Sequence, residues 1–175
     1  MKIGIISDTH DNISNLLKAF EVLNKERVDQ VFFCGDLVAC FTIDYFTKLK
    51  TPVKAVFGNN EGDKVGILER IKRNSLDFEY APDRKLMWDL VLNEKRMAVF
   101  HGHQSAITDN LINSQVFDYV ITGHTHLPHI KKIKKTIWIN PGCVCGVCGT
   151  DKADVVKASL AILNLATNKT EIIDI

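Results

Sequence analysis

Two closely spaced histidines, His124 and His126, follow an apolar run that reads as a buried strand. The run contains Val120 and Ile121, and Gly123 interrupts it before the histidines. A neutral imidazole binds divalent transition metals, and alternate residues of an extended loop can serve two adjacent ions. The pair therefore indicates a candidate metal site, with a solvated turn as the alternative.

Other apolar runs also end in clusters of Gly, Asp, Asn or His. Ligands of open α/β sheets gather beyond the carboxyl ends of the strands, so these clusters are expected to converge. Five of the six histidines lie in such clusters, and only His129 does not. The candidate side chains are Asp8, His10, Asp36, Asn59, His101, His103, His124 and His126.

These side chains form a mixed oxygen and nitrogen set, which favours Mn, Fe, Ni or Zn over Ca and over thiolate-type zinc. Even without His103, the groups are too many for one tetrahedral ion and suit two ions roughly 3.5–4 Å apart. Such a pair holds a bridging hydroxide at neutral pH and neutralises charge on a phosphoryl group attacked in line. Asp36 is the natural bridging carboxylate, although Gly35-Asp36 and Gly58-Asn59, taken singly, could be turns.

The elements that must position these groups follow from hydrophobic periodicity. The pattern predicts a helix from about residue 16 to residue 26 and an antiparallel excursion over residues 74–95. It predicts further helices over residues 42–50, 64–73 and 105–116. A hairpin is expected over residues 130–139. Strands are expected over residues 3–6, 31–33, 53–57, 97–100, 118–122, 158–165 and 170–173.

Composition limits the classes of function. Lys and Arg number 22 and Asp and Glu 21, so the net charge is too small to attract nucleic acid or an anionic membrane. No apolar run approaches the ~20 residues of a spanning helix, and the N-terminus begins with a strand-like run. We therefore expect one α/β domain over residues 1–175, a cytoplasmic location and reduced cysteines. A homo-oligomer is left open.

In this order and spacing, five motifs resemble those of the calcineurin-like metallophosphoesterase superfamily. They are Asp8-x-His10, Gly35-Asp36, Gly58-Asn59, His101-Gly-His103 and Gly123-His-Thr-His126. The small size and Asn140-Pro-Gly142 resemble the compact YfcE-type phosphodiesterase branch, and the similarity covers about residues 1–142. The resemblance implies a four-layer αββα sandwich with a dinuclear site at the sheet edge. It also implies a small phosphoester substrate and two divalent transition-metal ions: Mn foremost, with Ni, Fe or Zn as alternatives.

Carried over motif by motif, the resemblance assigns ligands to each ion. One ion would take Asp8, His10, Asp36 and His126, and the other Asp36, Asn59, His101 and His124. The catalytic groups would be Asp36, Asn60 and His103.

The chain departs from the family pattern after the motif Asn. Many members carry His there and the compact branch often carries Cys, whereas this chain has Asn60. An amide can hydrogen-bond a phosphate oxygen but cannot act as a general acid, so the leaving-group proton would have to come from His103 or from water. Asn60 could also simply shape a turn.

A second departure follows Asn140-Pro-Gly142. The compact branch usually continues with Ser and, a few residues later, an Arg, whereas this chain carries Cys143, Cys145 and Cys148 with no Arg nearby. We interpret these cysteines as small, semi-buried residues of a tight loop. A soft-metal site or a redox role, with Cys34 near in space, is the alternative.

The leading hypothesis is a dinuclear metal-dependent phosphodiesterase. A phosphomonoesterase or pyrophosphohydrolase could use the same site. A non-catalytic protein-binding scaffold is the third hypothesis, because the retromer subunit of this fold is regarded as acting through protein contacts. A pure scaffold has no physical need of seven correctly placed ligands, which argues against it.

Overall fold

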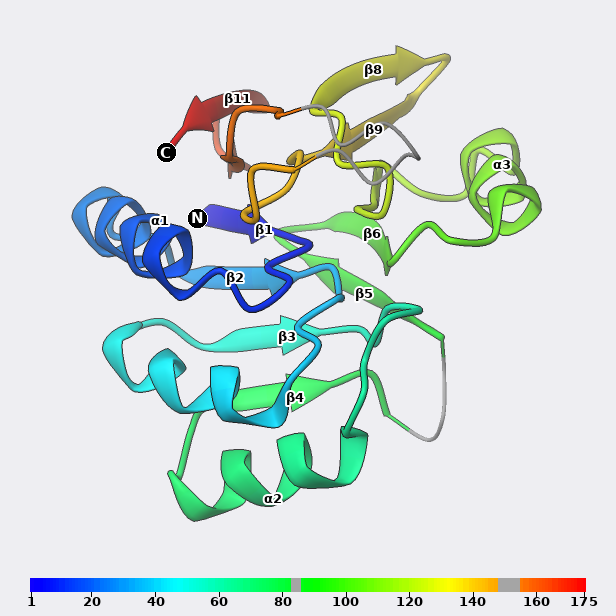
Figure 1. Ribbon diagram of the computed structural model, residues 1–175. Helices are drawn as coiled ribbons and strands as arrows, with labels where there is room; N and C mark the ends of the chain where they lie inside the picture. Colours follow the sequence, from blue (N-terminus) through cyan, green and yellow to red (C-terminus); the bar gives the residue numbers. More distant parts are fainter. Residues whose placement is uncertain (83–85, 148–154) are drawn as a thin grey trace.

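The described part of the chain forms two β-sheets with helices on their outer faces (Figure 1). The structure is a computed structural model that describes residues 1–82, 86–147 and 155–175. Within these ranges, no helix has both the length and the apolar character needed to cross a membrane.

The first sheet contains six strands in the order β11-β10-β1-β2-β3-β4. Strands β1 (Lys2–Ile6), β2 (Gln30–Phe33), β3 (Val53–Ala55) and β4 (Phe78–Tyr80) run parallel. Strands β10 (Ser159–Asn164) and β11 (Lys169–Asp174) add an antiparallel edge beside β1. Every residue of β2 is buried, as expected for a parallel strand covered on both faces.

The second sheet contains five strands in the order β5-β6-β7-β9-β8. Strands β6 (Lys95–Phe100), β7 (Tyr119–Ile121) and β9 (Thr136–Asn140) run parallel in its centre. Strands β5 (Met87–Leu92) and β8 (His129–Ile133) are its antiparallel edges. Parallel strands end at the same edge of their sheet. The loops that follow β1, β2 and β3 therefore leave one edge of the first sheet, and those that follow β6 and β7 leave one edge of the second.

Within the described ranges, three apolar cores separate four layers, which confirms the expected αββα sandwich. The first core joins the first sheet to α1 (Ile13–Glu26), η1 (Cys40–Lys48) and α2 (Lys64–Arg73). The second lies between the sheets, and the third lies between the second sheet and α3 (Ser105–Asn113). In Figure 1, α1 and α3 stand on opposite sides of the sheets.

Strand β6 shows how sequence alternation builds these layers. Met97 and Val99 point into the core between the sheets, while Ala98 between them faces α3. Successive side chains of a strand point to opposite faces, so a strand that is apolar throughout must be covered on both sides.

One expectation is made more specific and another is corrected. The segment expected as a helix over residues 42–50 is a 3₁₀-helix, with i to i+3 bonds such as Thr42 N–H to the Ala39 carbonyl at 3.1 Å. Its β-branched and aromatic residues are weak α-helix formers. The antiparallel excursion over residues 74–95 is wrong in its first part, because β4 pairs in parallel with β3 and only β5 pairs antiparallel with β6. Alternating apolar and polar residues show that one face of a strand is buried. They do not show to which sheet the strand belongs.

Candidate metal centre

Backbone hydrogen bonds bring the loops after β1 and β2 together. The N–H of Asp8 donates to the Gly35 carbonyl at 2.9 Å, and the N–H of His10 donates to the Asp36 carbonyl at 3.2 Å. The motif side chains of both loops are therefore fixed relative to each other before any ion is considered.

A second set of bonds joins the loops of the other sheet to this pair. The Gly123 N–H donates to the His101 carbonyl at 2.8 Å, which links the loops after β7 and β6. The backbone N–H of His124 donates to Oδ2 of Asp8 at 2.9 Å. This last bond connects loops from the two sheets across the edge where they meet.

The backbone at this edge is strained at the candidate ligands. Five of the seven have a positive φ: Asp8, His10, Asp36, His124 and His126. The left-handed conformation costs an L-residue roughly 1–2 kcal/mol, and Asp, Asn and His adopt it more readily than bulkier residues do. Such residues persist where surrounding structure fixes them, and they gather at functional sites.

Glycines leave room for the buried carboxylates. A Cβ built on Gly58 would overlap Oδ1 of Asp36, and one built on Gly123 would overlap the Ser7 hydroxyl and crowd Asp8. The glycines that precede Asn59 and His124 therefore let the backbone approach the carboxylates more closely than any other residue would allow.

The first group of candidate ligands is Asp8, His10 and His126, whose ligand atoms lie within 4.8 Å of one another. Nε2 of His126 is 3.3 Å from Oδ1 of Asp8. Nε2 of His10 is 3.9 Å from the same oxygen and 3.5 Å from Oδ2 of Asp36. This geometry brings together the four residues expected around one ion.

The second group lies on the other side of Asp36. Nε2 of His101 is 3.5 Å from Oδ1 of Asp36 and 2.9 Å from Oδ1 of Asn59. The His124 ring lies 5.1 Å from the His101 ring, centroid to centroid. Asp8 also falls within 4.8 Å of the Asp36 and His101 ligand atoms, so it adjoins both groups.

Unsatisfied polar atoms indicate that divalent ions fit here. Oδ1 of Asp8 and Nε2 of His10 are buried, and neither has a hydrogen-bond partner in the described part of the chain. Buried polar atoms are almost always paired, so these two atoms, which face each other without partners, fit a cation as a shared partner.

The histidine hydrogen bonds support the same conclusion. Nδ1 of His101 lies 2.7 Å from the Cys34 carbonyl, and Nδ1 of His126 lies 2.5 Å from the Val147 carbonyl. A carbonyl accepts, so each Nδ1 carries a proton, and each Nε2 points towards a carboxylate, the side on which it can bind an ion. This is the usual way in which proteins orient metal-binding histidines.

Charge is strongly coupled across the two groups. Burial raises the pKa of Asp36, but hydrogen bonding and positive charge from His101 and hydrogen bonds from Asn60 outweigh burial and hold it well below its ordinary value. Burial lowers the pKa of His126, yet its bonds to Asp8, Cys143 and the Val147 carbonyl raise it to about 11.

Asn60 and His103 occupy different places beside these groups. The backbone and side-chain N–H groups of Asn60 donate to Oδ1 and Oδ2 of Asp36 at 2.9 and 2.8 Å, so the amide orients the carboxylate. The His103 ring is 5.5 Å from His101. Burial first, then the charges of His101 and His124, lower the pKa of His103.

A carboxylate that the motifs did not include holds two of the loops together. Glu61 accepts the Leu37 N–H at 3.2 Å and the Gly58 N–H at 2.6 Å, so it connects the loops after β2 and β3. Its position directly after Asn59-Asn60 was the available signal. A carboxylate side chain is an effective acceptor for two otherwise unpaired backbone donors.

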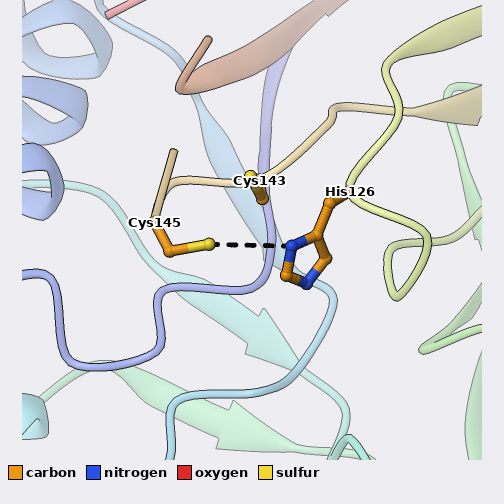
Figure 2. Close-up of side chains that lie close together, drawn as sticks. All are labelled: His126, Cys143 and Cys145. Carbon is orange, nitrogen blue, oxygen red and sulfur yellow. Dashed lines mark hydrogen bonds between the residues drawn. The ribbon is translucent and has the colours of Figure 1, made fainter. Parts of the chain in front are cut away.

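The sequence also did not predict that two of the cysteines lie beside the histidine loop. Cys143 and Cys145 are buried, and Sγ of Cys145 lies 3.7 Å from Nδ1 of His126 (Figure 2). Cys34 is buried in the core between the sheets and contributes its carbonyl to His101. Cys148, the third cysteine of the loop, lies outside the described residues.

Comparison with known proteins places these motifs in one family. The family model for the calcineurin-like phosphoesterase superfamily domain matches residues 1–168. A phosphodiesterase of Methanocaldococcus jannaschii is 36% identical over 146 residues, which cover 83% of this chain and 86% of the relative.

Solved structures give the same relationship. An archaeal phosphodiesterase superposes with a TM-score of 0.86 at 31% identity, covering 100% of both chains. YfcE, a phosphoesterase from E. coli, matches 100% of both chains with a TM-score of 0.69 at 19% identity, which is a likeness of fold alone.

Proposed function

Since the chain belongs to the calcineurin-like phosphoesterase superfamily, we propose that it is a phosphodiesterase that works with two divalent transition-metal ions, foremost Mn²⁺. The observation that carries the proposal is the position of Asp36. One oxygen of this carboxylate faces His10 and the other faces His101, each at 3.5 Å from Nε2. A single buried carboxylate between two imidazole groups suits a bridge between two ions.

The ligand sets proposed are those that the motifs suggest. Asp8, His10, Asp36 and His126 would hold one ion, and Asp36, Asn59, His101 and His124 the other. Bound there, two ions would supply a hydroxide nucleophile at neutral pH and offset the charge of the phosphoryl group.

The residues of the chain would do the remaining work. The Cys34 and Val147 carbonyls hold the rings of His101 and His126 with Nε2 turned inwards. Asn60 holds both oxygens of Asp36, so the carboxylate cannot rotate away from the two groups. His103, at the rim, would hydrogen-bond a phosphoryl oxygen.

An apolar hollow beside the centre supports a diester substrate. It has a volume of about 640 Å³ and is lined mainly by Phe57, Leu68, Tyr80 and Leu86, with Lys64 over the Phe57 ring at 5.0 Å. Two of its lining residues connect it to the proposed site. Phe57 immediately precedes Gly58-Asn59, and the charge of Lys64, after burial and the charges of His101 and His124, helps to lower the pKa of His103. A diester carries a second organic group that this hollow would accept, whereas a monoester does not.

The strain and burial of the centre argue for catalysis over a scaffold role. Burying Asp8 and Asp36 side by side and holding five residues at positive φ lower stability. A binding surface elsewhere on the molecule would gain nothing from either cost.

A panel of phosphodiesters and phosphomonoesters, assayed after chelation and with Mn²⁺, Ni²⁺, Fe²⁺ or Zn²⁺ added back, tests the proposal. We expect diester hydrolysis that disappears on chelation and returns with Mn²⁺. The Leu68→Asp variant should raise KM about 10-fold for diesters with two bulky groups, since one lost apolar contact is worth roughly 1–3 kcal/mol. It should leave methyl aryl diesters unchanged. Preference for monoesters, or hydrolysis without metal, would contradict the proposal.

A further inference from the structure

Two thiols and an imidazole nitrogen meet behind the proposed metal centre. Cys143 and Cys145 follow β9, and Figure 2 shows both side chains beside the His126 ring. The ligand atoms of the three residues lie within 4.8 Å of one another. Exposed fractions are 0% for Cys143, 7% for Cys145 and 5% for His126, so the group is closed to bulk solvent.

The donor atoms in this group differ from those of the proposed catalytic centre. The centre offers carboxylate, amide and imidazole atoms, whereas this group offers two sulfurs and one nitrogen. Thiolates select soft ions, and a Cys₂His set with a free fourth position is an established zinc arrangement. An ion such as Mn²⁺, which prefers oxygen, would not compete for it.

His126 belongs to both groups through opposite sides of its ring. Nε2 faces Oδ1 of Asp8 at 3.3 Å, while Nδ1 faces Sγ of Cys145 at 3.7 Å and the Val147 carbonyl at 2.5 Å. A neutral imidazole has one lone pair, on whichever nitrogen lacks the proton. It can therefore serve one group at a time.

We propose that Cys143, Cys145 and Nδ1 of His126 bind one thiophilic divalent ion of the Zn²⁺ class, and that this ion opposes metal binding beside Asp8. When it binds, the two thiols release their protons to solvent, Nδ1 of His126 gives up its proton, and the neutral imidazole keeps a single proton on Nε2. The Nε2 lone pair is then lost to the group of Asp8 and His10. The antagonism rests on the proposed function, whereas the binding of the thiophilic ion does not.

Titration with Cd²⁺ tests the binding directly. The full chain is freed of metal by chelation, kept reduced with a phosphine, and titrated while thiolate-to-cadmium charge-transfer absorption is followed in the ultraviolet. We expect the absorption to reach a plateau that corresponds to two thiolates per chain. The variant Cys143→Ser/Cys145→Ser should lose it.

Cys40→Ser is the matched control, because this thiol lies at the start of η1 and outside the group, and it should keep the full absorption. Cys145→Ser alone is a milder change should the double variant fold poorly. It should weaken Cd²⁺ binding by at least about 10-fold, the lower end of what even an outer-shell change costs. Absence of the band in the native chain, or its persistence in the double variant, would overturn the proposal.

The antagonism is tested on protein loaded with Mn²⁺, using the electron paramagnetic resonance signal of free Mn²⁺. Adding one equivalent of Cd²⁺ should release Mn²⁺ from the native chain and not from Cys143→Ser/Cys145→Ser. Equal release from both proteins, or a thiolate band without release, would contradict the shared histidine. Diester hydrolysis without a thiolate band would defeat this inference alone. A thiolate band in a chain that binds no Mn²⁺ would instead defeat the proposed function.

Discussion

At the scale of single residues, Asp36 has the most consequential position. Its carboxylate is almost fully buried, lies between His10 and His101, and receives two hydrogen bonds from Asn60. Positive charge and hydrogen bonding keep it ionised despite burial. A bridging role requires a permanent negative charge at this point. Substitution by Asn removes that charge and keeps nearly the same side-chain shape.

The variant Asp36→Asn should therefore lose metal and activity together. We expect phosphodiesterase activity to fall by more than about 100-fold, since even outer-shell changes at metal sites cost about 10–100-fold. Metal content per chain and turnover are the measurements. Asp109→Asn, an exposed change on α3, is the control. Near-normal turnover by a folded, metal-replete Asp36→Asn protein would show that Asp36 does not bridge.

Asn60 leads to a prediction about leaving groups. Its amide cannot supply a proton, and general acid catalysis is typically worth ~10²–10⁴-fold. An aryl leaving group departs as a stable anion and needs no proton, whereas an alkoxide does. Aryl diesters should therefore be hydrolysed faster than alkyl diesters by orders of magnitude, and Asn60→His should narrow the gap.

Rates across a series of diesters with graded leaving-group pKa measure this dependence. His103→Ala is the companion variant. A shallow dependence in the native chain that becomes steep in His103→Ala would mean that His103 delivers the proton and that our interpretation of Asn60 is wrong.

At the scale of elements, the site depends on how loops from adjacent strands are held together. Glu61 binds the Leu37 N–H after β2 and the Gly58 N–H after β3. Removing its carboxylate leaves two backbone donors without acceptors, and each such loss costs about 1–3 kcal/mol. Glu61→Ala should lower the free energy of unfolding by about 1–3 kcal/mol for each of the two donors, and it should weaken metal binding.

Urea unfolding of the metal-free protein and Mn²⁺ titration by calorimetry separate the two effects. Glu69→Ala removes an exposed carboxylate of α2 and should change neither quantity. If Glu61→Ala behaves like Glu69→Ala, the loops are positioned by other contacts.

The sequence predicts the elements whose apolar residues recur at regular spacing. It does not predict the features that depend on tertiary contacts. Helix α2 has the predicted bounds because its apolar spacing is regular and Asp63 caps it, accepting the Gly66 N–H at 2.8 Å. The parallel pairing of β4 with β3 was not predicted, because the alternation of apolar and polar residues in a strand does not specify its partner strand.

At the site, the residue types and their order indicated which loops converge, because each cluster follows a buried strand. The positive φ values and the carbonyl partners of His101 and His126 could not be derived, since they depend on contacts between loops far apart in sequence. The approach of Cys145 to His126 was missed for the same reason.

At the scale of the whole molecule, the proposed ions would bind loops from both sheets at once. An ion between Asp8 and His126 would join the loops after β1 and β7, which the chain itself already connects through the His124 N–H bond to Asp8. Metal binding should therefore stabilise the entire sandwich and not one loop.

Thermal unfolding with and without Mn²⁺ measures this stabilisation. A ligand at about 100 times its Kd adds about 2.7 kcal/mol, which for a chain of this size raises Tm by roughly 5–10 °C. Chelation should reverse the shift, and Asp36→Asn should abolish it. An unchanged Tm at saturating Mn²⁺ would mean that the ion does not bind the folded centre.

Two ions that share Asp36 are the central feature of the proposed site, and anomalous diffraction from crystals grown with Mn²⁺ can detect them. Data collected above and below the manganese absorption edge locate the ions without reference to any assumed ligand. We predict two peaks roughly 3.5–4 Å apart, one on each side of the Asp36 carboxylate. His10 and His126 should contact the first, and His101 and His124 the second. One peak, or two that do not share Asp36, would mean that Asp36 does not bridge two ions.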